Sequence, residues 1–177
     1  EREYLYEKAY SVRYEHYKNS VYVRGLIEFS NYCKNDCTYC GISIHNKELT
    51  RYHMTPEEVI KTAEIGYSLG FRTFVMQGGE DTSFTDDKFS AIISSIKTQF
   101  PEAAVTLSIG ERSKESYQKL YDAGADRFLI RHETINKKLY EPLHPKMSYE
   151  NRIKSLFDLK DIGFQVGTGF MVGVPGQ

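Results

Sequence analysis

The sequence predicts an α/β fold in which a parallel sheet forms a partial β/α barrel of the TIM type. Short apolar and β-branched runs alternate with helical segments along the 177 residues, which is the pattern of successive βα units. Polar motifs follow the C-terminal ends of the expected strands, where the active sites of barrels collect. An open doubly wound sheet is the alternative, and it would concentrate ligand-binding residues at one switch point instead.

Residues 1–20 are expected to form a helix that packs on the barrel ahead of the first strand. Apolar and aromatic residues recur within it at helical spacing, namely Leu5, Ala9, Tyr10, Tyr14 and Tyr17. Tyrosines in such a pattern fill a core more often than they form a binding platform. Residues 21–30 (VYVRGLIEFS) predict the first strand, which leads directly into a loop that contains cysteines.

A helix and a second strand are expected after the cysteine loop. The Thr55-Pro56-Glu57-Glu58 segment combines a capping box with a proline at the first helical position. A helix is therefore expected over residues 56–69, with Gly70 as its left-handed end. Residues 71–77 (FRTFVMQ) predict the second strand, which ends at Gly78-Gly79-Glu80.

Three further βα units follow the same pattern. Apolar residues at helical spacing predict a helix over residues 86–99, and residues 103–109 predict the third strand. Ser113 and Gly124 bound the next helix, before a fourth strand over residues 127–131. Ser148 and Gly163 bound the last helix, before a fifth strand over residues 165–172. Because eight strands close a TIM barrel, residues 21–177 are expected to be a half-barrel cut from a longer chain.

The composition excludes several classes of protein. Lys and Arg number 23 against 24 Asp and Glu, and this net charge of −1 gives no electrostatic reason to expect nucleic acid as a partner. The sequence has no run of about 18 apolar residues and no signal pattern at its start, so we expect no membrane span and no secretion. A cytoplasmic location is the corresponding expectation.

The three cysteines of the chain, Cys33, Cys37 and Cys40, form one C-x3-C-x2-C segment. An odd and clustered set is a poor disulfide framework, and clustered thiols in a cytosolic protein indicate a metal site. Three thiolates on one loop can bind three irons of a 4Fe–4S cluster and leave the fourth iron open, because the chain has no further cysteine. A zinc site with His45 or His53 as fourth ligand is an alternative, as are three unliganded thiols.

This segment, with Tyr39 before its last cysteine and a strand before its first, resembles the cluster-binding motif of the radical SAM superfamily. The resemblance implies an enzyme in which the open iron binds the amino and carboxylate groups of S-adenosylmethionine (SAM). It also implies reductive cleavage of SAM to methionine and a 5′-deoxyadenosyl radical. In such an enzyme the cofactors perform the bond cleavage, and the protein binds and orients them.

Motifs along nearly the whole chain narrow the resemblance to the HydE family of FeFe-hydrogenase maturases, with methylornithine synthase and biotin synthase as relatives. These motifs are Arg24–Cys33, Arg51–Glu58, Gly79–Asp81, Ser108–Glu111, Arg131–Thr134, Glu150–Arg152 and Gly169–Gln177. The resemblance implies a function in assembly of the hydrogenase H-cluster, although the half-barrel alone is expected to be inactive. A radical SAM reaction of the methylornithine synthase or biotin synthase type is the first alternative, and a non-catalytic zinc-binding α/β domain is the second.

The resemblance also implies roles for individual residues. Gly78, Gly79 and Glu80 would border the SAM amino group, since glycines let the backbone approach closely and a carboxylate suits an ammonium. Glu133 would accept hydrogen bonds from the ribose hydroxyls, and Arg152 would bind the SAM carboxylate as a two-donor fork. Without the resemblance, a solvated turn and surface salt bridges would be the ordinary interpretation of these residues.

Further contacts are expected at the barrel mouth. Tyr39 is expected to pack near the cluster, and Met171, in a glycine-containing fifth strand, is expected to contact adenine. Strand ends at Gln77, Thr106, Ser108 and Arg131 are expected to contact SAM or substrate. The implied partners are SAM and a small organometallic or amino-acid-derived substrate, together with the maturases HydG and HydF and an electron donor such as ferredoxin or flavodoxin.

Overall fold

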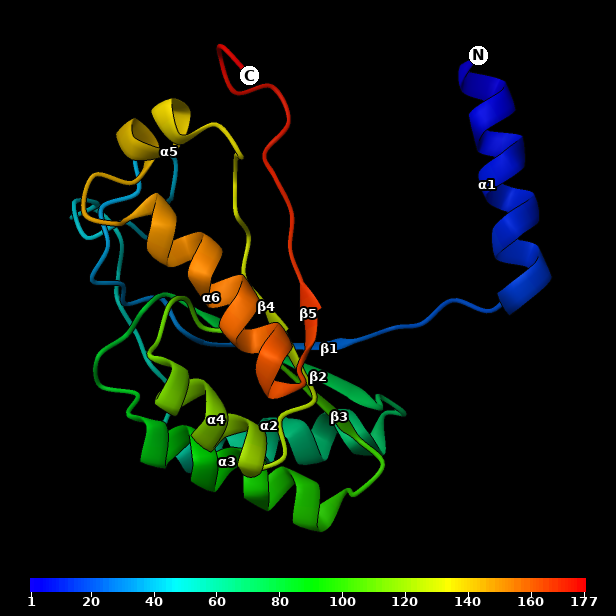
Figure 1. The fold of residues 1–177 in the computed structure, drawn as a ribbon. Coiled ribbons are helices and arrows are strands. Elements are labelled where there is room, and N and C mark those ends of the chain that lie inside the picture. Colours follow the sequence, from blue (N-terminus) through cyan, green and yellow to red (C-terminus); the bar gives the residue numbers. More distant parts are fainter.

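The computed structural model describes all residues from 1 to 177. Its centre is a five-stranded parallel sheet in the order β1-β2-β3-β4-β5 (Figure 1). The strands are β1 (Gly25–Ser30), β2 (Thr73–Gly78), β3 (Ala104–Ser108), β4 (Arg127–Leu129) and β5 (Gln165–Gly167). Every strand lies beside its neighbour in sequence, so the sheet has no switch point and is part of an α/β barrel. The predicted fold class is confirmed.

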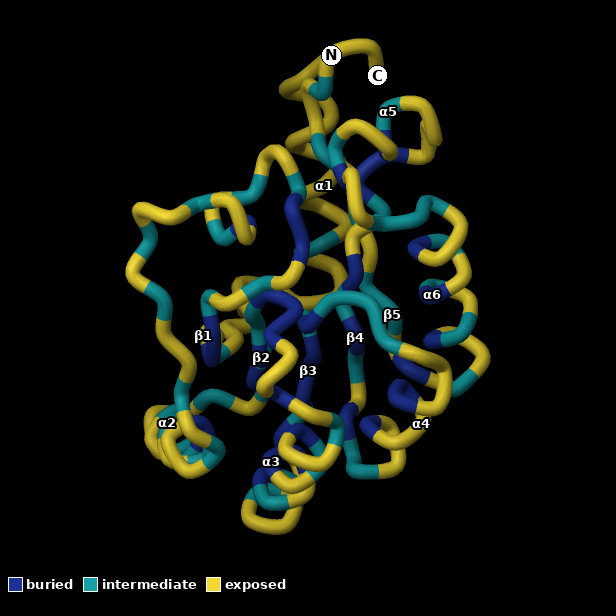
Figure 2. The backbone as a smooth tube through the Cα atoms, turned by 90° about the vertical axis from the view of Figure 1, so that its left-hand side faces the viewer, coloured by how far each residue is buried: buried dark blue, intermediate teal, exposed yellow.

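Helices cover one face of the sheet. They are α2 (Pro56–Ser68), α3 (Asp86–Gln99), α4 (Lys114–Asp122) and α6 (Tyr149–Ile162), and each lies between two successive strands (Figures 1 and 2). The core between sheet and helices includes the buried side chains of Phe29, Phe74, Met76, Ile92, Ile96, Leu107, Phe128 and Leu159. Because side chains alternate along a strand, the residues between these core positions face the other side of the sheet. None of the helices combines the length and the apolar character that a membrane-crossing helix needs.

Local signals in the sequence set the ends of these helices. The Thr55 side chain accepts the Glu58 backbone N–H and the Glu58 carboxylate accepts the Thr55 N–H, so the expected capping box is present. Ser113 and Ser148 cap α4 and α6 through their hydroxyl oxygens. Gly163 ends α6 with a φ of 116°, a left-handed conformation that favours glycine.

The structure contains one helix that the sequence pattern does not predict, α5 (Lys137–Leu143), between β4 and α6. The Asn136 side chain accepts the Lys138 backbone N–H and caps its start. The seven residues are too few for a clear helical period, and Pro142 lies inside them. The fully buried Tyr140 holds α5 in place by packing edge-to-face on Tyr149 at the start of α6.

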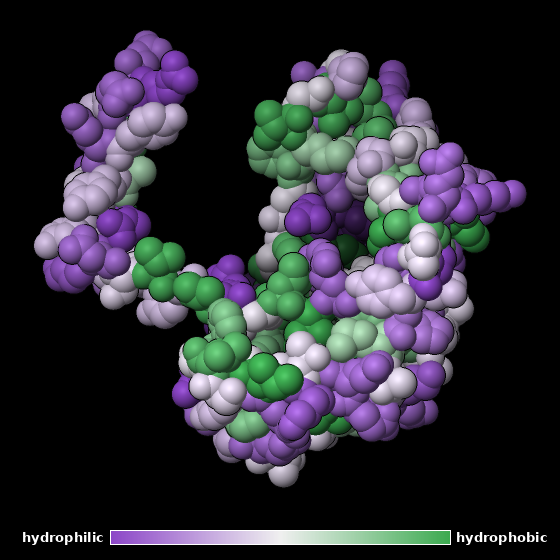
Figure 3. All heavy atoms as spheres, turned by 180° about the vertical axis from the view of Figure 1, so that it is seen from behind, coloured by the Kyte–Doolittle hydropathy of each residue, from purple (hydrophilic) through white to green (hydrophobic).

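The N-terminal helix forms as expected, but it does not pack on the barrel. Helix α1 (Arg2–Tyr17) has no buried residue and stands apart from the sheet and its helices (Figure 1). Residues 18–24 join it to β1 as an exposed linker, which includes a hydrophobic run in Figure 3. The expected packing is therefore corrected. Tyrosines and charged residues dominate α1, so Leu5, Ala9 and Val12 are its only aliphatic side chains, and they offer little apolar area for docking.

The first and fifth strands are shorter than the sequence pattern predicts. Strand β1 begins at Gly25, which pairs with Phe74 near the start of β2, and the preceding residues have no paired neighbour. Strand β5 ends at Gly167 rather than at residue 172, because its partner β4 has only three residues. Beyond it, Phe170 makes an isolated bridge to Glu133. The expected glycine-containing strand around Met171 is thus an irregular segment.

Candidate functional site

A cavity of about 170 Å³ lies at the C-terminal ends of the strands, beside the cysteine loop, and is called the rim cavity here. It is lined by most of the predicted site residues, namely Cys33, Cys37, Tyr39, Cys40, Gly78, Gly79, Glu80, Ser108, Arg131, Glu133 and Arg152. They come from the loop after β1, the ends of β2 and β3, the segment after β4, and α6. Parallel strands all end at one edge, and this topology brings residues distant in sequence into one cavity.

Three predicted residues do not line the rim cavity. Gln77 precedes Gly78 on β2 and pairs in register with Ser108 of β3. Met171 lies beside the cavity, where its backbone N–H donates to the Glu133 carbonyl at 2.9 Å. Thr106 lines a second cavity, nearer the N-terminal ends of the strands.

One arginine organises the cysteine loop. The Arg51 guanidinium donates hydrogen bonds to the backbone carbonyls of Asn31, Ile42, Ser43 and Asn46. The bonds to Ile42 and Ser43 are 2.8 and 2.6 Å long. These carbonyls lie on both sides of the cysteine segment in sequence, so Arg51 fixes the two ends of the chain that carries all the thiols.

The three thiols are free, half-buried and adjacent to the rim cavity. Cys33 Sγ accepts the backbone N–H groups of Asn35 at 3.5 Å and Glu80 at 3.4 Å. Burial, and then the neighbouring Cys33 and Cys40, raise the pKa of the Cys37 thiol to about 11. Thiolates packed this closely need positive charge among them, so the donor set fits a metal cluster. No three His, Cys, Asp or Glu side chains are arranged to hold a single metal ion, whereas in a 4Fe–4S cluster each thiolate binds its own iron.

The Gly78-Gly79-Glu80 turn lies against the cysteine loop. A Cβ at Gly79 would come within 2.6 Å of the Cys33 Cβ, so this approach requires glycine. The buried Glu80 carboxylate binds the Lys34 ammonium at 3.0 Å and accepts the Glu111 backbone N–H at 2.9 Å. Glu80 therefore presents an ordered carboxylate at the rim cavity.

Arg152 is buried, and each of its guanidinium nitrogens has a partner. Nε donates to Glu111 Oε1 at 2.6 Å, Nη1 donates to the Arg131 carbonyl, and Nη2 lies 3.7 Å from the Met147 sulfur. Burial raises the pKa of the Glu111 carboxyl, although the Arg152 charge opposes this shift. The Arg152 guanidinium, which was predicted to bind the SAM carboxylate, thus already binds Glu111. A ligand carboxylate would displace Glu111 from Arg152 or bind beside it.

Glu133 has an unusual backbone conformation. Its φ of 64° lies in the left-handed region, where residues other than glycine are uncommon. Its N–H donates to the Gly169 carbonyl at 3.1 Å, and its carbonyl accepts the Met171 N–H at 2.9 Å, so two bonds to the segment after β5 hold it. Its side chain is buried at the rim cavity. Strain of this kind clusters at functional sites.

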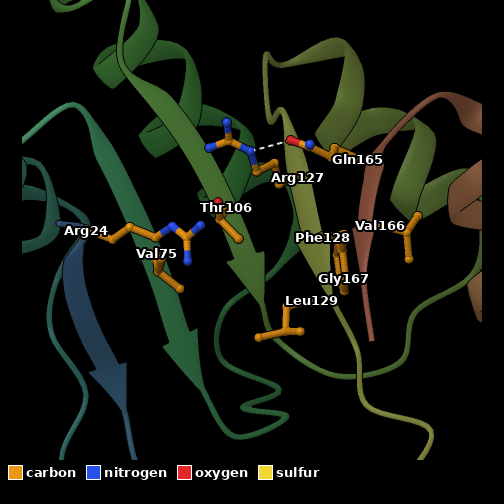
Figure 4. A pocket seen from close by; sticks show the side chains of 9 residues that line it. All are labelled: Arg24, Val75, Thr106, Arg127, Phe128, Leu129, Gln165, Val166 and Gly167. Carbon is orange, nitrogen blue, oxygen red and sulfur yellow. Dashed lines mark hydrogen bonds between the residues drawn. The ribbon is translucent and has the colours of Figure 1, made fainter. Parts of the chain in front are cut away.

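The second cavity, of about 350 Å³, lies on the face of the sheet opposite the helices. Figure 4 shows the side chains of Arg24, Thr106 and Arg127 on this face, with Arg127 Nε donating to Gln165 Oε1. The Thr106 hydroxyl is buried and has no hydrogen-bond partner. Two guanidinium groups and an unpaired hydroxyl fit the anionic end of a small molecule.

Comparison with known proteins agrees with this geometry. The family model of the radical SAM superfamily matches residues 27–177, which include the cysteine loop, every residue of the rim cavity and, except for Arg24, the lining of the second cavity. The chain belongs to the radical SAM superfamily. Radical SAM proteins are enzymes, and membership implies a 4Fe–4S cluster and SAM as cofactors.

Individual radical SAM relatives are similar along nearly the whole chain. The FeFe hydrogenase maturase subunit HydE of Thermotoga maritima is 45% identical over 99% of this chain and 50% of its own length. The 3-methylornithine synthase of Methanosarcina acetivorans is 30% identical over 98% of this chain and 50% of its own. The crystal structure of methylornithine synthase (PylB) superposes with a TM-score of 0.89 at 28% identity, covering 97% of this chain and 51% of that one. The expected kinship to HydE, methylornithine synthase and biotin synthase is confirmed, and the chain spans about half the length of these relatives.

Sequence patterns assigned no separate role to several residues that shape this radical SAM site: Arg51, Gly110, Glu111 and His144. The pair Gly110-Glu111 follows the third strand, and this position at the barrel rim was the available signal. Arg51 and His144 lie in irregular segments, where no local pattern marks them. Apart from the stacking of His144 on the nearby Tyr140 ring, the contacts of Arg51 and His144 are with backbone carbonyls or with a residue distant in sequence, so only the fold reveals them.

Proposed function

We propose that this chain holds a 4Fe–4S cluster on Cys33, Cys37 and Cys40, binds SAM beside it, and belongs to a HydE-type maturase that acts in assembly of the FeFe-hydrogenase H-cluster. The observation that carries the proposal is the rim cavity, where the three thiols meet charged side chains suited to SAM. Identity of 45% to HydE over 99% of the chain favours this function over other radical SAM reactions.

The cysteine loop would hold the cluster through one thiolate per iron and leave one iron open for SAM. Arg51 maintains the shape of the loop, and the N–H groups of Asn35 and Glu80 stabilise negative charge on Cys33. When bound, the cluster and SAM supply the reductive cleavage that yields methionine and a 5′-deoxyadenosyl radical. An electron donor such as ferredoxin or flavodoxin would provide the electron.

Each charged side chain at the rim cavity would bind a different part of SAM. Glu80 would bind the amino group, and Glu133 would accept hydrogen bonds from the ribose hydroxyls. Arg152 would bind the carboxylate beside Glu111 or in exchange for it. Because Glu80, Glu133 and Arg152 are buried, their charged groups are little exposed to water and each charged contact with SAM would be strengthened.

The second cavity supports a small anionic substrate. Arg24, Arg127 and the unpaired Thr106 hydroxyl would bind a carboxylate or a similar group at one end of an organometallic or amino-acid-derived molecule. The rim cavity and the second cavity share the wall residue Leu129, so the two cavities adjoin and the other end of such a substrate would extend toward the rim. In this proposal the maturases HydG and HydF act before and after the enzyme in the cytoplasm.

One alternative has a specific observation in its favour. The close superposition on PylB, with a TM-score of 0.89, is also compatible with a methylornithine synthase type of reaction on an amino acid. The two functions share the cluster and SAM and differ only in substrate. They are therefore separated by product, not by cofactor content.

The test uses the full-length protein, purified and reconstituted without oxygen. We expect a brown protein with roughly four irons per chain, which converts SAM to methionine and 5′-deoxyadenosine when reduced. Supplied together with HydG and HydF, it should activate apo-hydrogenase, and formation of methylornithine instead would favour the alternative. Arg152→Ala should weaken SAM binding, whereas Arg72→Ala should not, because Arg72 precedes β2 at the opposite end of that strand from the rim cavity. A colourless zinc protein without SAM cleavage would overturn the proposal.

A further inference from the structure

Tyr39 and His144 are joined by a hydrogen bond between the cysteine loop and the segment that precedes α6. Tyr39 Oη lies 2.8 Å from His144 Nε2, and the two rings meet edge-to-face with centroids 5.4 Å apart. Tyr39 lines the rim cavity. His144 is only 1% exposed and lies behind Tyr39 without lining that cavity.

The surroundings of His144 decide which atom of the pair donates. Nδ1 lies 3.0 Å from the Tyr140 carbonyl oxygen, which can only accept, so Nδ1 carries the hydrogen. In the neutral imidazole Nε2 is then bare and accepts the Tyr39 O–H. The Tyr140 ring stacks on the imidazole at 4.0 Å and 20°, which fixes the plane of the acceptor.

Two further hydrogen bonds, each from a backbone N–H, join the same segments. The Thr38 N–H donates to the Leu143 carbonyl at 3.0 Å, and the Lys146 N–H donates to Asp36 Oδ1 at 3.2 Å. Residues 36–39 and 143–146 therefore form one unit. The Tyr39–His144 bond is the contact of this unit that reaches the rim cavity.

We propose that His144 is a positioning residue for SAM binding, which holds the Tyr39 ring in the wall of the rim cavity. The inference rests on the proposed function, because SAM is the ligand expected there. Tyr39 remains 44% exposed, so without this bond its side chain could turn toward solvent. SAM would then have to reorder the ring on binding, whereas the three cysteine ligands would be unaffected.

Titration of SAM into reconstituted full-length protein tests the inference with Tyr39→Phe, His144→Phe and the double variant. Phenylalanine at 144 keeps an aromatic ring against Tyr140 and removes both ring nitrogens. We expect each single variant to bind SAM about threefold to tenfold more weakly, which corresponds to one neutral hydrogen bond. The double variant should lose no more SAM affinity than the single variant that binds SAM more weakly, because both changes remove the same hydrogen bond. His144→Gln, whose amide oxygen can accept the Tyr39 hydroxyl, should recover part of the affinity.

Two further readouts separate positioning from structural damage. Iron content and the EPR spectrum of the reduced cluster without SAM should match wild type in all variants, while the spectral change on adding SAM should require more SAM. His16→Phe, on the detached α1, is the control and should bind SAM normally. Iron loss in His144→Phe, or wild-type SAM affinity in Tyr39→Phe, would overturn the inference. A wild-type protein that holds iron but binds no SAM would instead refute the proposed function.

Discussion

Gly110 packs directly against the side chain of Glu80. A Cβ at residue 110 would come within 2.5 Å of the Glu80 carboxyl carbon, and the φ of 79° at Gly110 is one that other residues rarely adopt. Space and backbone conformation therefore both require glycine in the turn that follows β3. Through this contact, the turn after one strand sets the position of the carboxylate that we assign to the SAM amino group.

Replacement of Gly110 by alanine should displace Glu80. We expect Gly110→Ala to weaken SAM binding and to lower the free energy of unfolding by about 1–3 kcal/mol through backbone strain alone. Gly70→Ala is the matched control, since Gly70 has a φ of 100° but nothing within 4 Å of its missing Cβ. SAM titration and thermal unfolding of both variants check this. Equal losses of SAM affinity in the two would contradict the importance of the Glu80 contact.

Removal of the Arg51 guanidinium should loosen the cysteine loop. We expect Arg51→Ala to lower the iron content after reconstitution and to reduce stability by at least about 1.5 kcal/mol, the lower value for one hydrogen bond to a charged group. Arg51→Lys should be intermediate, because an ammonium cannot reproduce the planar fork. Arg72→Ala removes bonds to the carbonyls of Tyr67 and Phe71 far from the loop, and it should keep full iron. Wild-type iron and stability in Arg51→Ala would show that the loop needs no such support.

Each cysteine should be indispensable for the cluster. Replacement of Cys33, Cys37 or Cys40 by alanine is expected to abolish stable iron binding, because the chain has no other thiol to substitute. Removal of iron from the wild type by a chelator should lower its melting temperature, since the cluster binds the folded state preferentially. Iron analysis and visible absorption measure the first effect, and calorimetry measures the second. Full iron content in any one of the variants would exclude that cysteine as a ligand.

Acid should destabilise the protein partly through Asp81. Burial alone would raise the pKa of this carboxyl, but hydrogen bonds from the Ser30 hydroxyl at 2.6 Å and the Ser83 N–H at 2.8 Å hold it below the ordinary value of 3.8. The unfolded chain then binds the proton more tightly, so this stabilisation is present above the unfolded pKa and is lost as pH falls toward the folded one. Asp81→Asn should be less stable at neutral pH and lose less stability below about pH 4. Urea unfolding across this range tests it, and a steeper acid loss in the variant would contradict it.

Features that depend on residues a few positions apart were predicted correctly from the sequence, whereas features that depend on distant residues were not. The capping box at Thr55 and Glu58 and the helix end at Gly163 involve residues within a few positions, so they read directly from the sequence. The cysteine motif is equally local. Strand ends behaved differently: β5 stops at Gly167 because β4 is short, and pairing of this kind depends on a neighbour some 40 residues earlier in a parallel ladder.

The sequence by itself determined the parallel α/β architecture, the cysteine loop and the turn that carries Glu80, because hydrophobic period, glycine and capping residues act over a few positions. Only the tertiary structure decided that α1 stands apart, that Glu111 engages Arg152, and that His144 holds Tyr39. These are choices of partner among groups far apart in sequence. Such choices depend on which side chains the folded backbone brings within hydrogen-bond distance, and no local pattern records that distance.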